Sequence, residues 1–254
     1  MAGGKNPGRS RCRLDQLLVE KGLISSRSRA RAMIMAKKIL VDDQPVDKPG
    51  SQVDPQARII VKEADHPYVS RGGLKLEKAL TTFSISVQDK ICLDIGASTG
   101  GFTDCLLRFG AQKVYAVDVG YGQLAWPLRN NPKVVVIERT NIRYTPFEAI
   151  GRKMDMVVAD TSFISLKTVI PAAEKFMGPG SRVIALIKPQ FEAGKQYVGK
   201  GGVVKDPEIR QKVVADISQF FAGKGYGVED VIPSPVLGPK GNTEYLISLV
   251  FNGH

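Results

Sequence analysis

The stretch Asp94-Ile95-Gly96-Ala97-Ser98-Thr99-Gly100-Gly101-Phe102-Thr103 decides the fold of this 254-residue chain. An apolar run at 91–95 leads into it, and a helical pattern over 102–109 follows it. Small residues between a strand and a helix let the backbone approach a ligand at the carboxyl end of an open α/β sheet. Such a turn is shared by proteins that bind NAD, FAD or S-adenosylmethionine, so its spacing has to decide between them.

The spacing favours S-adenosylmethionine. Ser98 stands where a dinucleotide-binding G-x-G-x-x-G motif has its second glycine, which a pyrophosphate requires. Asp118 closes the second apolar run and is placed to accept hydrogen bonds from a ribose. Asn141, beyond the third run, is the candidate for contact with the adenine. The predicted cofactor-binding residues are Asp94, Gly96, Ala97, Ser98, Gly100, Gly101, Phe102, Asp118 and Asn141.

From about residue 89 onward, apolar runs alternate with helical patterns. The apolar runs are 91–95, 114–117, 134–137, 156–159, 183–187 and 245–251, and the main helical stretches are 102–109, 165–176 and 207–223. This alternation predicts an α/β domain with a mostly parallel, doubly wound sheet. We place the domain at 74–254, with a helix at its start, and interpret the glycine- and lysine-rich segment 194–202 as a loop.

The first quarter of the chain predicts a small α+β domain over 13–62, between a flexible tail (1–12) and a linker (63–73). Apolar spacing indicates a helix over 13–21 that ends at Gly22, and a second helix capped by Ser25 or Ser26 that runs to Lys37. Strands are expected at 39–41 and 59–61, a turn at 42–45, and a connector at 51–55.

Charge points to a polyanionic partner. The formal net charge is +11, and residues 1–62 hold 13 Lys and Arg against 6 Asp and Glu. The second predicted helix contains no acidic residue, which favours phosphate binding over a merely solvated face. The predicted RNA-binding residues are Arg13, Arg27, Arg31, Lys37 and Lys38.

Other classes are disfavoured by what the sequence lacks. Three cysteines and two histidines give no metal-ligand spacing and no disulfide framework, and they fit a reducing cytoplasm. No window approaches the ~18 uninterrupted apolar residues of a membrane span, so we expect no membrane partner. Nothing in the sequence indicates a protein partner.

The end of the fourth apolar run narrows the chemistry. It reads Ala159-Asp160-Thr161-Ser162-Phe163, without the prolines typical of exocyclic-amine methylation, and no strand end in this half carries a cysteine nucleophile. Of the methylation reactions considered, transfer to an oxygen remains. If that oxygen is a ribose hydroxyl, the reaction benefits from a nearby base that takes its proton. The candidate catalytic residues, which converge only if the fold is as predicted, are Lys75, Asp160, Lys188 and Glu244.

These motifs resemble a known family. Residues 13–61 resemble the RNA-binding module of ribosomal protein S4, although Ala36 precedes the lysines where that module usually has glycine. Residues 13–252 resemble the TlyA (haemolysin A) family, and the second domain resembles FtsJ-like methyltransferases. The motifs that carry this resemblance are S-R-G-G-L-K-L, D-I-G-A-S-T-G-G-F-T-D, A-D-T-S-F-I, I-K-P-Q-F-E and G-N-T-E-Y.

The resemblance implies a Rossmann-like domain with a seven-stranded, mostly parallel sheet. It also implies S-adenosylmethionine as cofactor and transfer of its methyl group to the 2′-hydroxyl of a ribose, that of a cytidine, in ribosomal RNA within ribosomal subunits. Lys75, Asp160, Lys188 and Glu244 fall on the family's Lys-Asp-Lys-Glu tetrad. Two alternatives stay open: a membrane-active haemolysin, and an RNA-binding protein without catalysis.

Overall fold

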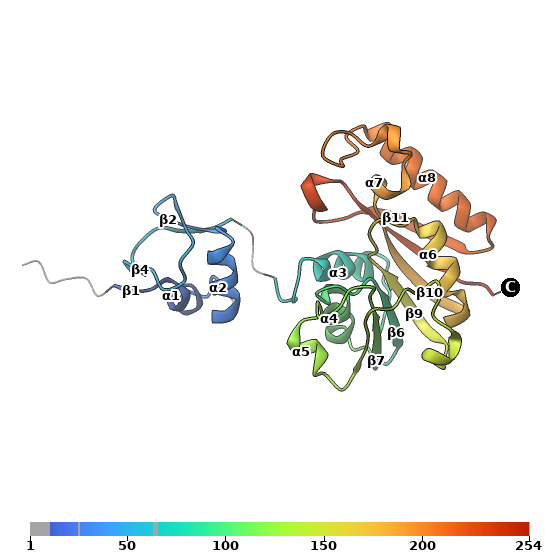
Figure 1. The fold of residues 1–254 in the computed structure, drawn as a ribbon, viewed down its shortest axis with the longest axis horizontal. Helices are drawn as coiled ribbons and strands as arrows, with labels where there is room; N and C mark the ends of the chain where they lie inside the picture. The colour runs from blue at the N-terminus through green and yellow to red at the C-terminus, as the bar shows by residue number, and fades with distance from the viewer. Residues whose placement is uncertain (1–10, 25, 63–65, 254) are drawn as a thin grey trace, which may run out of the picture. The chain divides into compact units, whose positions relative to one another are not determined.

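The computed structural model describes residues 11–24, 26–62 and 66–253. These form two units that divide between Pro67 and Tyr68 (Figure 1). Most of the predicted tail, the alternative cap Ser25, and 63–65 of the predicted linker lie outside the described residues.

The first unit is a small α+β fold. Its elements are β1 (Cys12–Arg13), α1 (Leu14–Glu20), α2 (Arg27–Met35), β2 (Ile39–Val41), β3 (Gln44–Val46), β4 (Gln52–Val53) and β5 (Ile59–Val61). Leu14 and Leu18 of α1 pack against Ile34 of α2 and Ile39 of β2, all fully buried. Helix α2 begins where Ser26 Oγ accepts a hydrogen bond from the backbone N–H of Arg29 at 3.3 Å.

Two sequence predictions for this unit are wrong in detail. The turn expected over 42–45 is confined to Asp42 and Asp43, which have positive φ, and β3 already begins at Gln44 and pairs with β2. Pro45 is tolerated because β3 is an edge strand of the β3-β2-β5 sheet. The expected connector over 51–55 contains β4, which pairs with β1 and so draws Cys12 out of the predicted tail. Strands this short carry no readable periodicity.

The second unit is built on one seven-stranded sheet. Its strands are β6 (Ile91–Ile95), β7 (Lys113–Val117), β8 (Val134–Ile137), β9 (Met154–Ala159), β10 (Met177–Ile187), β11 (Gly227–Pro233) and β12 (Tyr245–Val250). The order is β11-β12-β10-β9-β6-β7-β8, parallel from β10 to β8, with β12 antiparallel to both of its neighbours. This confirms the predicted α/β class with a mostly parallel sheet.

Helices cover both faces of that sheet (Figure 1). They are α3 (Gly72–Thr82), α4 (Gly101–Arg108), α5 (Trp126–Arg129), α6 (Leu166–Ala173), α7 (Pro189–Glu192) and α8 (Pro207–Gly223), and the single 3₁₀ turns are η1 (Phe147–Ala149), η2 (Glu174–Phe176), η3 (Lys195–Tyr197) and η4 (Pro239–Gly241). Leu76 and Leu106, from α3 and α4, belong to one buried cluster, whereas Ile170 and Ile217, from α6 and α8, belong to the other. The strands are therefore apolar on both sides.

The topology places a site at one edge of the sheet. The chain passes from β6 through β7 to β8 on one side, and β9 then pairs with the opposite side of β6. Ligands of open α/β sheets bind outside the carboxyl ends of the strands at such a reversal. Several elements of this unit were not predicted, among them the outer strand β11 and the short helices α5 and α7, because none of these three carries an apolar run of its own.

Candidate active site

The turn between β6 and α4 depends on glycine. Gly96 has φ +83°, and a Cβ there would lie 2.7 Å from the backbone oxygen of Asp160. Beneath the turn, Thr103 Oγ1 donates to Asp94 Oδ2 at 2.6 Å. Burial raises the pKa of Asp94 to about 7, and its Oδ1 has no hydrogen-bond partner among the described residues. A buried acceptor of this kind is available to a donor on a ligand or a water.

Asp118 lies at the end of β7, directly beside that turn. Its Oδ2 accepts from the backbone N–H of Ser98 at 2.8 Å, and its Oδ1 accepts from the backbone N–H of Gly120 at 2.6 Å. Each carboxylate oxygen has two lone pairs, so each can accept a further hydrogen bond. Asp118 and Asn141 line one cavity of about 620 Å³, whose wall also includes the apolar Ile142.

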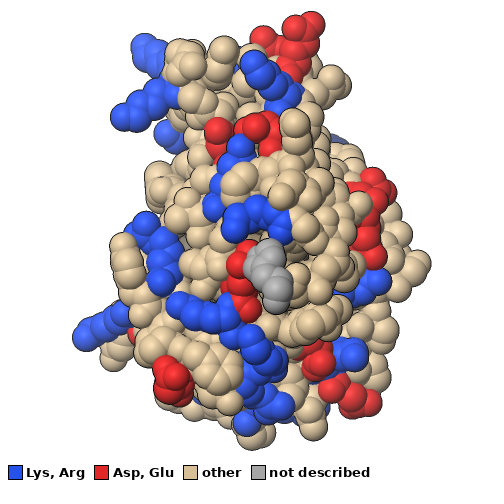
Figure 2. All heavy atoms as spheres, turned by 90° about the vertical axis from the view of Figure 1, so that its right-hand side faces the viewer, with Lys and Arg blue, Asp and Glu red and all other residues tan. Residues whose placement is uncertain are grey.

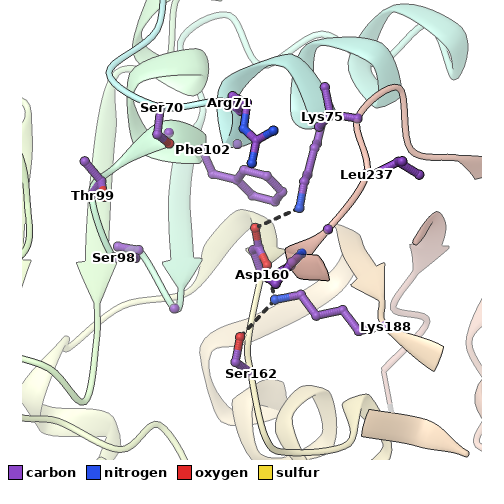
Figure 3. Close-up of a pocket in the computed structure, with 17 residues that line it drawn as sticks. Ser70, Arg71, Lys75, Ser98, Thr99, Phe102, Asp160, Ser162, Lys188 and Leu237 are labelled. Carbon is purple, nitrogen blue, oxygen red and sulfur yellow. Dashed lines mark hydrogen bonds and ion pairs between the residues drawn. The ribbon is translucent and has the colours of Figure 1, made fainter. Parts of the chain in front are cut away.

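A second cavity, of about 310 Å³, adjoins the first. The two share Gly96, Ser98, Asp160 and Ser162. The wall of the smaller cavity is completed by Arg71, which precedes α3, by Lys75 of α3, by Phe102 of α4, and by 236–239 (Figure 3). Seven of the nine predicted cofactor-binding residues line one or both cavities. The other two, Asp94 and Gly100, are buried and line neither.

The residues present fit S-adenosylmethionine. The larger cavity offers an apolar wall for an adenine and the Asp118 carboxylate for ribose hydroxyls. The smaller one offers the Arg71 guanidinium for a carboxylate, and the unpartnered Asp94 Oδ1 lies beneath the turn that separates the two. Neither cavity shows the closely spaced glycine amides that cradle a pyrophosphate, because Ser98 occupies the position where they would need a glycine.

Three of the four candidate catalytic side chains, those of Lys75, Asp160 and Lys188, line the smaller cavity (Figure 3), and the fourth, Glu244, contacts Lys75. Lys75 comes from α3, Asp160 follows β9, Lys188 follows β10, and Glu244 precedes β12. Lys75 Nζ donates to Glu244 Oε2 at 2.7 Å and lies 3.7 Å from Asp160 Oδ2. Lys188 Nζ lies 2.6 Å from Asp160 Oδ1. Asp160 thus bridges the two lysines, and the two ammonium groups are balanced by two carboxylates.

The charged side chains of this cluster are largely buried. Lys75, Lys188 and Glu244 are each at least nine-tenths buried. Buried charges persist only when they are paired and hydrogen-bonded, as they are here. Gly238 keeps the space beside Glu244 open, because a Cβ at that position would lie 2.1 Å from Glu244 Oε1.

Sequence reasoning missed four residues around Lys188. Ser162 Oγ lies 3.0 Å from Lys188 Nζ, and Gln190 Nε2 donates to Glu244 Oε1 at 3.3 Å. Glu192 accepts from Ser165 Oγ at 2.5 Å and from the backbone N–H of Leu166 at 2.8 Å, which ties α7 to the start of α6. The fourth is Phe163. All four lie within the motifs A-D-T-S-F-I and I-K-P-Q-F-E, and these motifs are the sequence signal that could have identified them.

An apolar cavity of about 710 Å³ shares Ser162 and Lys188 with the smaller cavity. Its wall contains Phe163 and Phe191, whose ring centroids are 4.9 Å apart. Phe163 is 89% exposed and has φ +64°, an unusual combination for a large apolar side chain. Asn242 fastens the loop over 194–202 to this wall, since its Nδ2 donates to the backbone oxygen of Gly202 at 2.9 Å.

The structure corrects the expectation that the basic residues of the first unit have no acidic partners, because several of them pair with an aspartate. Arg27 Nε and Arg13 Nε each lie 3.0 Å from a carboxylate oxygen of Asp15, which is fully buried in α1. The hydrogen bond from Arg13 is the largest cause that lowers the pKa of Asp15. The acidic partner comes from the neighbouring helix, so a search along the second helix alone could not find it. Lys37 lies 3.8 Å from Asp47, both exposed.

Charge elsewhere on the surface is mixed. Figure 2 shows lysine and arginine side chains interspersed with acidic ones across one face. Within the described ranges, no helix combines the length and the apolar character needed to cross a membrane.

The fold and this cluster define the class: a Rossmann-like, S-adenosylmethionine-dependent methyltransferase joined to an RNA-binding module. The model of the FtsJ-like methyltransferase family matches residues 68–251, and that of the S4 domain matches residues 12–59. The chain belongs to the TlyA family within that class, as the predicted resemblance indicated.

Relatives over nearly the whole chain support this assignment. A Mycobacterium tuberculosis 16S/23S rRNA (cytidine-2′-O)-methyltransferase, TlyA, is 49% identical over 240 residues, which is 94% of this chain and 90% of the relative. Hemolysin A of Brachyspira hyodysenteriae is 41% identical over 94% of this chain and 99% of its own length. A solved Streptococcus thermophilus structure described as a hemolysin has a TM-score of 0.74 at 41% identity, covering 96% of this chain and 89% of that one.

Proposed function

We propose that this enzyme methylates the 2′-hydroxyl of a cytidine ribose in ribosomal RNA within ribosomal subunits, in the cytoplasm. The observation that carries the proposal is the buried cluster in which Asp160 bridges Lys75 and Lys188 beside the cofactor cavities. The name of the M. tuberculosis relative supplies the base and the type of RNA.

The cofactor would be held across the two adjoining cavities. Asp118 is placed for its ribose hydroxyls, Asn141 and Ile142 for its adenine, and Arg71 for its carboxylate. When bound, S-adenosylmethionine supplies an electrophilic methyl group on a sulfonium. Lys188 lines the smaller cavity, which would hold that end of the molecule.

Lys188 is the proposed base. As a neutral amine, Nζ would accept the proton of the ribose hydroxyl while that oxygen takes the methyl group that the bound cofactor would supply. Asp160 and Ser162 hold Nζ at 2.6 and 3.0 Å, which fixes its direction. Lys75, held by Glu244, lies beside the other oxygen of Asp160 and so adds a second positive charge to the cluster. Positioning and proton transfer then share the acceleration.

The apolar cavity is suited to the acceptor nucleotide. A base stacked on the exposed Phe163 ring would bring its ribose beside Lys188, and such stacking is worth about 1–3 kcal/mol per base. The first unit supplies additional contacts to RNA phosphates through its basic helix α2.

One experiment tests the assignment of the modified atom. Ribosomal RNA from cells with and without the gene is mapped by primer extension at low nucleotide concentration, where a ribose 2′-O-methyl group causes a stop. We expect a gene-dependent stop at a cytidine, and purified protein should restore it in vitro with S-adenosylmethionine. A gene-dependent methyl group on a base, or none at all, contradicts the proposal.

A further inference from the structure

Gln190 is the one side chain of the apolar cavity whose amide is held by the catalytic cluster. It follows Lys188 by two positions, in the short helix α7, and lines the cavity together with Phe163 and Phe191. Its Nε2 donates to Glu244 Oε1 at 3.3 Å. Glu244 Oε2 in turn accepts from Lys75 Nζ at 2.7 Å.

This arrangement fixes which way the amide points. Glu244 pairs with Lys75 through Oε2 and accepts from Gln190 through Oε1, and a carboxylate oxygen of such an ion pair only accepts hydrogen bonds. The NH₂ group of Gln190 must therefore face Glu244, and its carbonyl oxygen must face the other way. A free glutamine could rotate its amide to present either group; this one presents an acceptor.

The acceptor has nothing to accept from within the protein. Gln190 Oε1 is shielded from solvent and has no hydrogen-bond partner among the described residues. An oriented, unsatisfied acceptor beside a cavity with an aromatic wall is a suitable partner for a planar ligand that carries an N–H donor.

We propose that Gln190 Oε1 accepts a hydrogen bond from the exocyclic amino group of the target base and so makes the enzyme select cytidine over uridine. Cytosine presents an N4 amino donor where uracil presents the O4 acceptor. With uracil, two acceptors would face each other and Oε1 would remain unsatisfied. The inference rests on the proposed function, since it assigns base selection to the site where the acceptor ribose would bind.

The test compares two matched substrates. Ribosomal subunits carry either cytidine or uridine at the mapped position, and single-turnover methylation by the full-length enzyme is measured with S-adenosylmethionine. For the wild-type enzyme we expect kcat/KM to be about 10- to 100-fold higher for cytidine. Gln190→Met keeps the length of the side chain but removes both hydrogen-bonding atoms, and it should reduce that ratio to within a few-fold of one.

The ratio of kcat/KM for cytidine to that for uridine distinguishes recognition of the base by Gln190 from a purely structural role of this residue. If Gln190 only positioned Glu244, Gln190→Met would lower both rates equally and leave the ratio unchanged, which would overturn the proposal. Gln211→Met, at an exposed position of α8, is the matched control and should leave both the rates and the ratio unchanged. Wild-type enzyme that methylates both substrates equally overturns base selection alone, whereas a lack of methylation of the cytidine substrate overturns the proposed function.

A measurement without any variant guards against misfolding of Gln190→Met. Wild-type enzyme is given reconstituted subunits in which the target cytidine lacks only its 4-amino group. A loss of about 10-fold or more relative to cytidine supports the contact, and an unchanged rate overturns it.

Discussion

Lys188 Nζ lies 2.6 Å from Asp160 Oδ1, so the two residues that directly follow the neighbouring strands β10 and β9 form an ion pair at the edge of the cofactor cavity. The contact exists because parallel strands end at the same edge of the sheet. The pair joins the site that would hold the cofactor to the cavity that would hold the acceptor.

Removal of the proposed base should abolish catalysis without loss of the cofactor. We expect Lys188→Ala to lower the single-turnover methylation rate by about 10²–10⁴-fold, while the Kd of S-adenosylmethionine, measured by calorimetry, changes little. Lys90→Ala, at an exposed lysine before β6 and so at the opposite edge of the sheet, is the control. Substantial activity in Lys188→Ala would refute the assigned role.

Glu192 should act by holding the segments that follow β9 and β10 next to each other. Glu192→Ala removes the acceptor of two hydrogen bonds at the start of α6, so we expect a loss of about 1–3 kcal/mol in the free energy of unfolding and a lower methylation rate. Glu192→Gln should recover most of both, because its amide can accept from Leu166 N–H and donate to Ser165 Oγ. Equal losses in the two variants would argue that the negative charge itself is needed.

The basic helix α2 should contribute to RNA affinity through phosphates. Arg31 is exposed, and Arg31→Ala should weaken binding to ribosomal subunits and lower the slope of log K against log salt by up to about one unit. The exposed Lys224, which belongs to the second unit, provides the control variant, Lys224→Ala. An unchanged slope in Arg31→Ala would place the RNA contact elsewhere.

Arg27 should behave differently from Arg31, because it pairs with the buried Asp15. Its removal is expected to lower stability as well as affinity, and thermal unfolding of the variant separates the two effects.

Asp94 should make stability depend on pH near neutrality. Burial raises its pKa from 3.8 to about 7, so the folded protein keeps a proton that the unfolded chain releases between about pH 4 and 7. The stability associated with this group is fully present below about pH 4 and is lost as the pH rises through 7. Denaturant unfolding at pH 5 and pH 8 should show a smaller difference for Asp94→Asn than for the wild-type protein. A pH dependence identical in both proteins would show that Asp94 titrates normally.

Much of the architecture could be predicted from the sequence. The strand β6 and the helix α8 have the residues expected, because a long apolar run or a strong helical period is local information. The strand β11 was missed because its side chains are only half-buried and its pairing partner, β12, follows it by a long segment. The strands β1 and β4 were missed because two residues show no period, and only their pairing defines them.

The sequence by itself determined the class of fold, the glycine-dependent turn at Gly96 and the identity of the four candidate catalytic residues. Periodicity, backbone sterics and residue chemistry are readable along a chain. Only the tertiary structure decided that Asp160 bridges the two lysines, that Asp15 holds Arg13 and Arg27, and that Glu244 orients the amide of Gln190. Each of these contacts joins side chains from different elements, and their distances are set by how helices and strands pack rather than by any local preference.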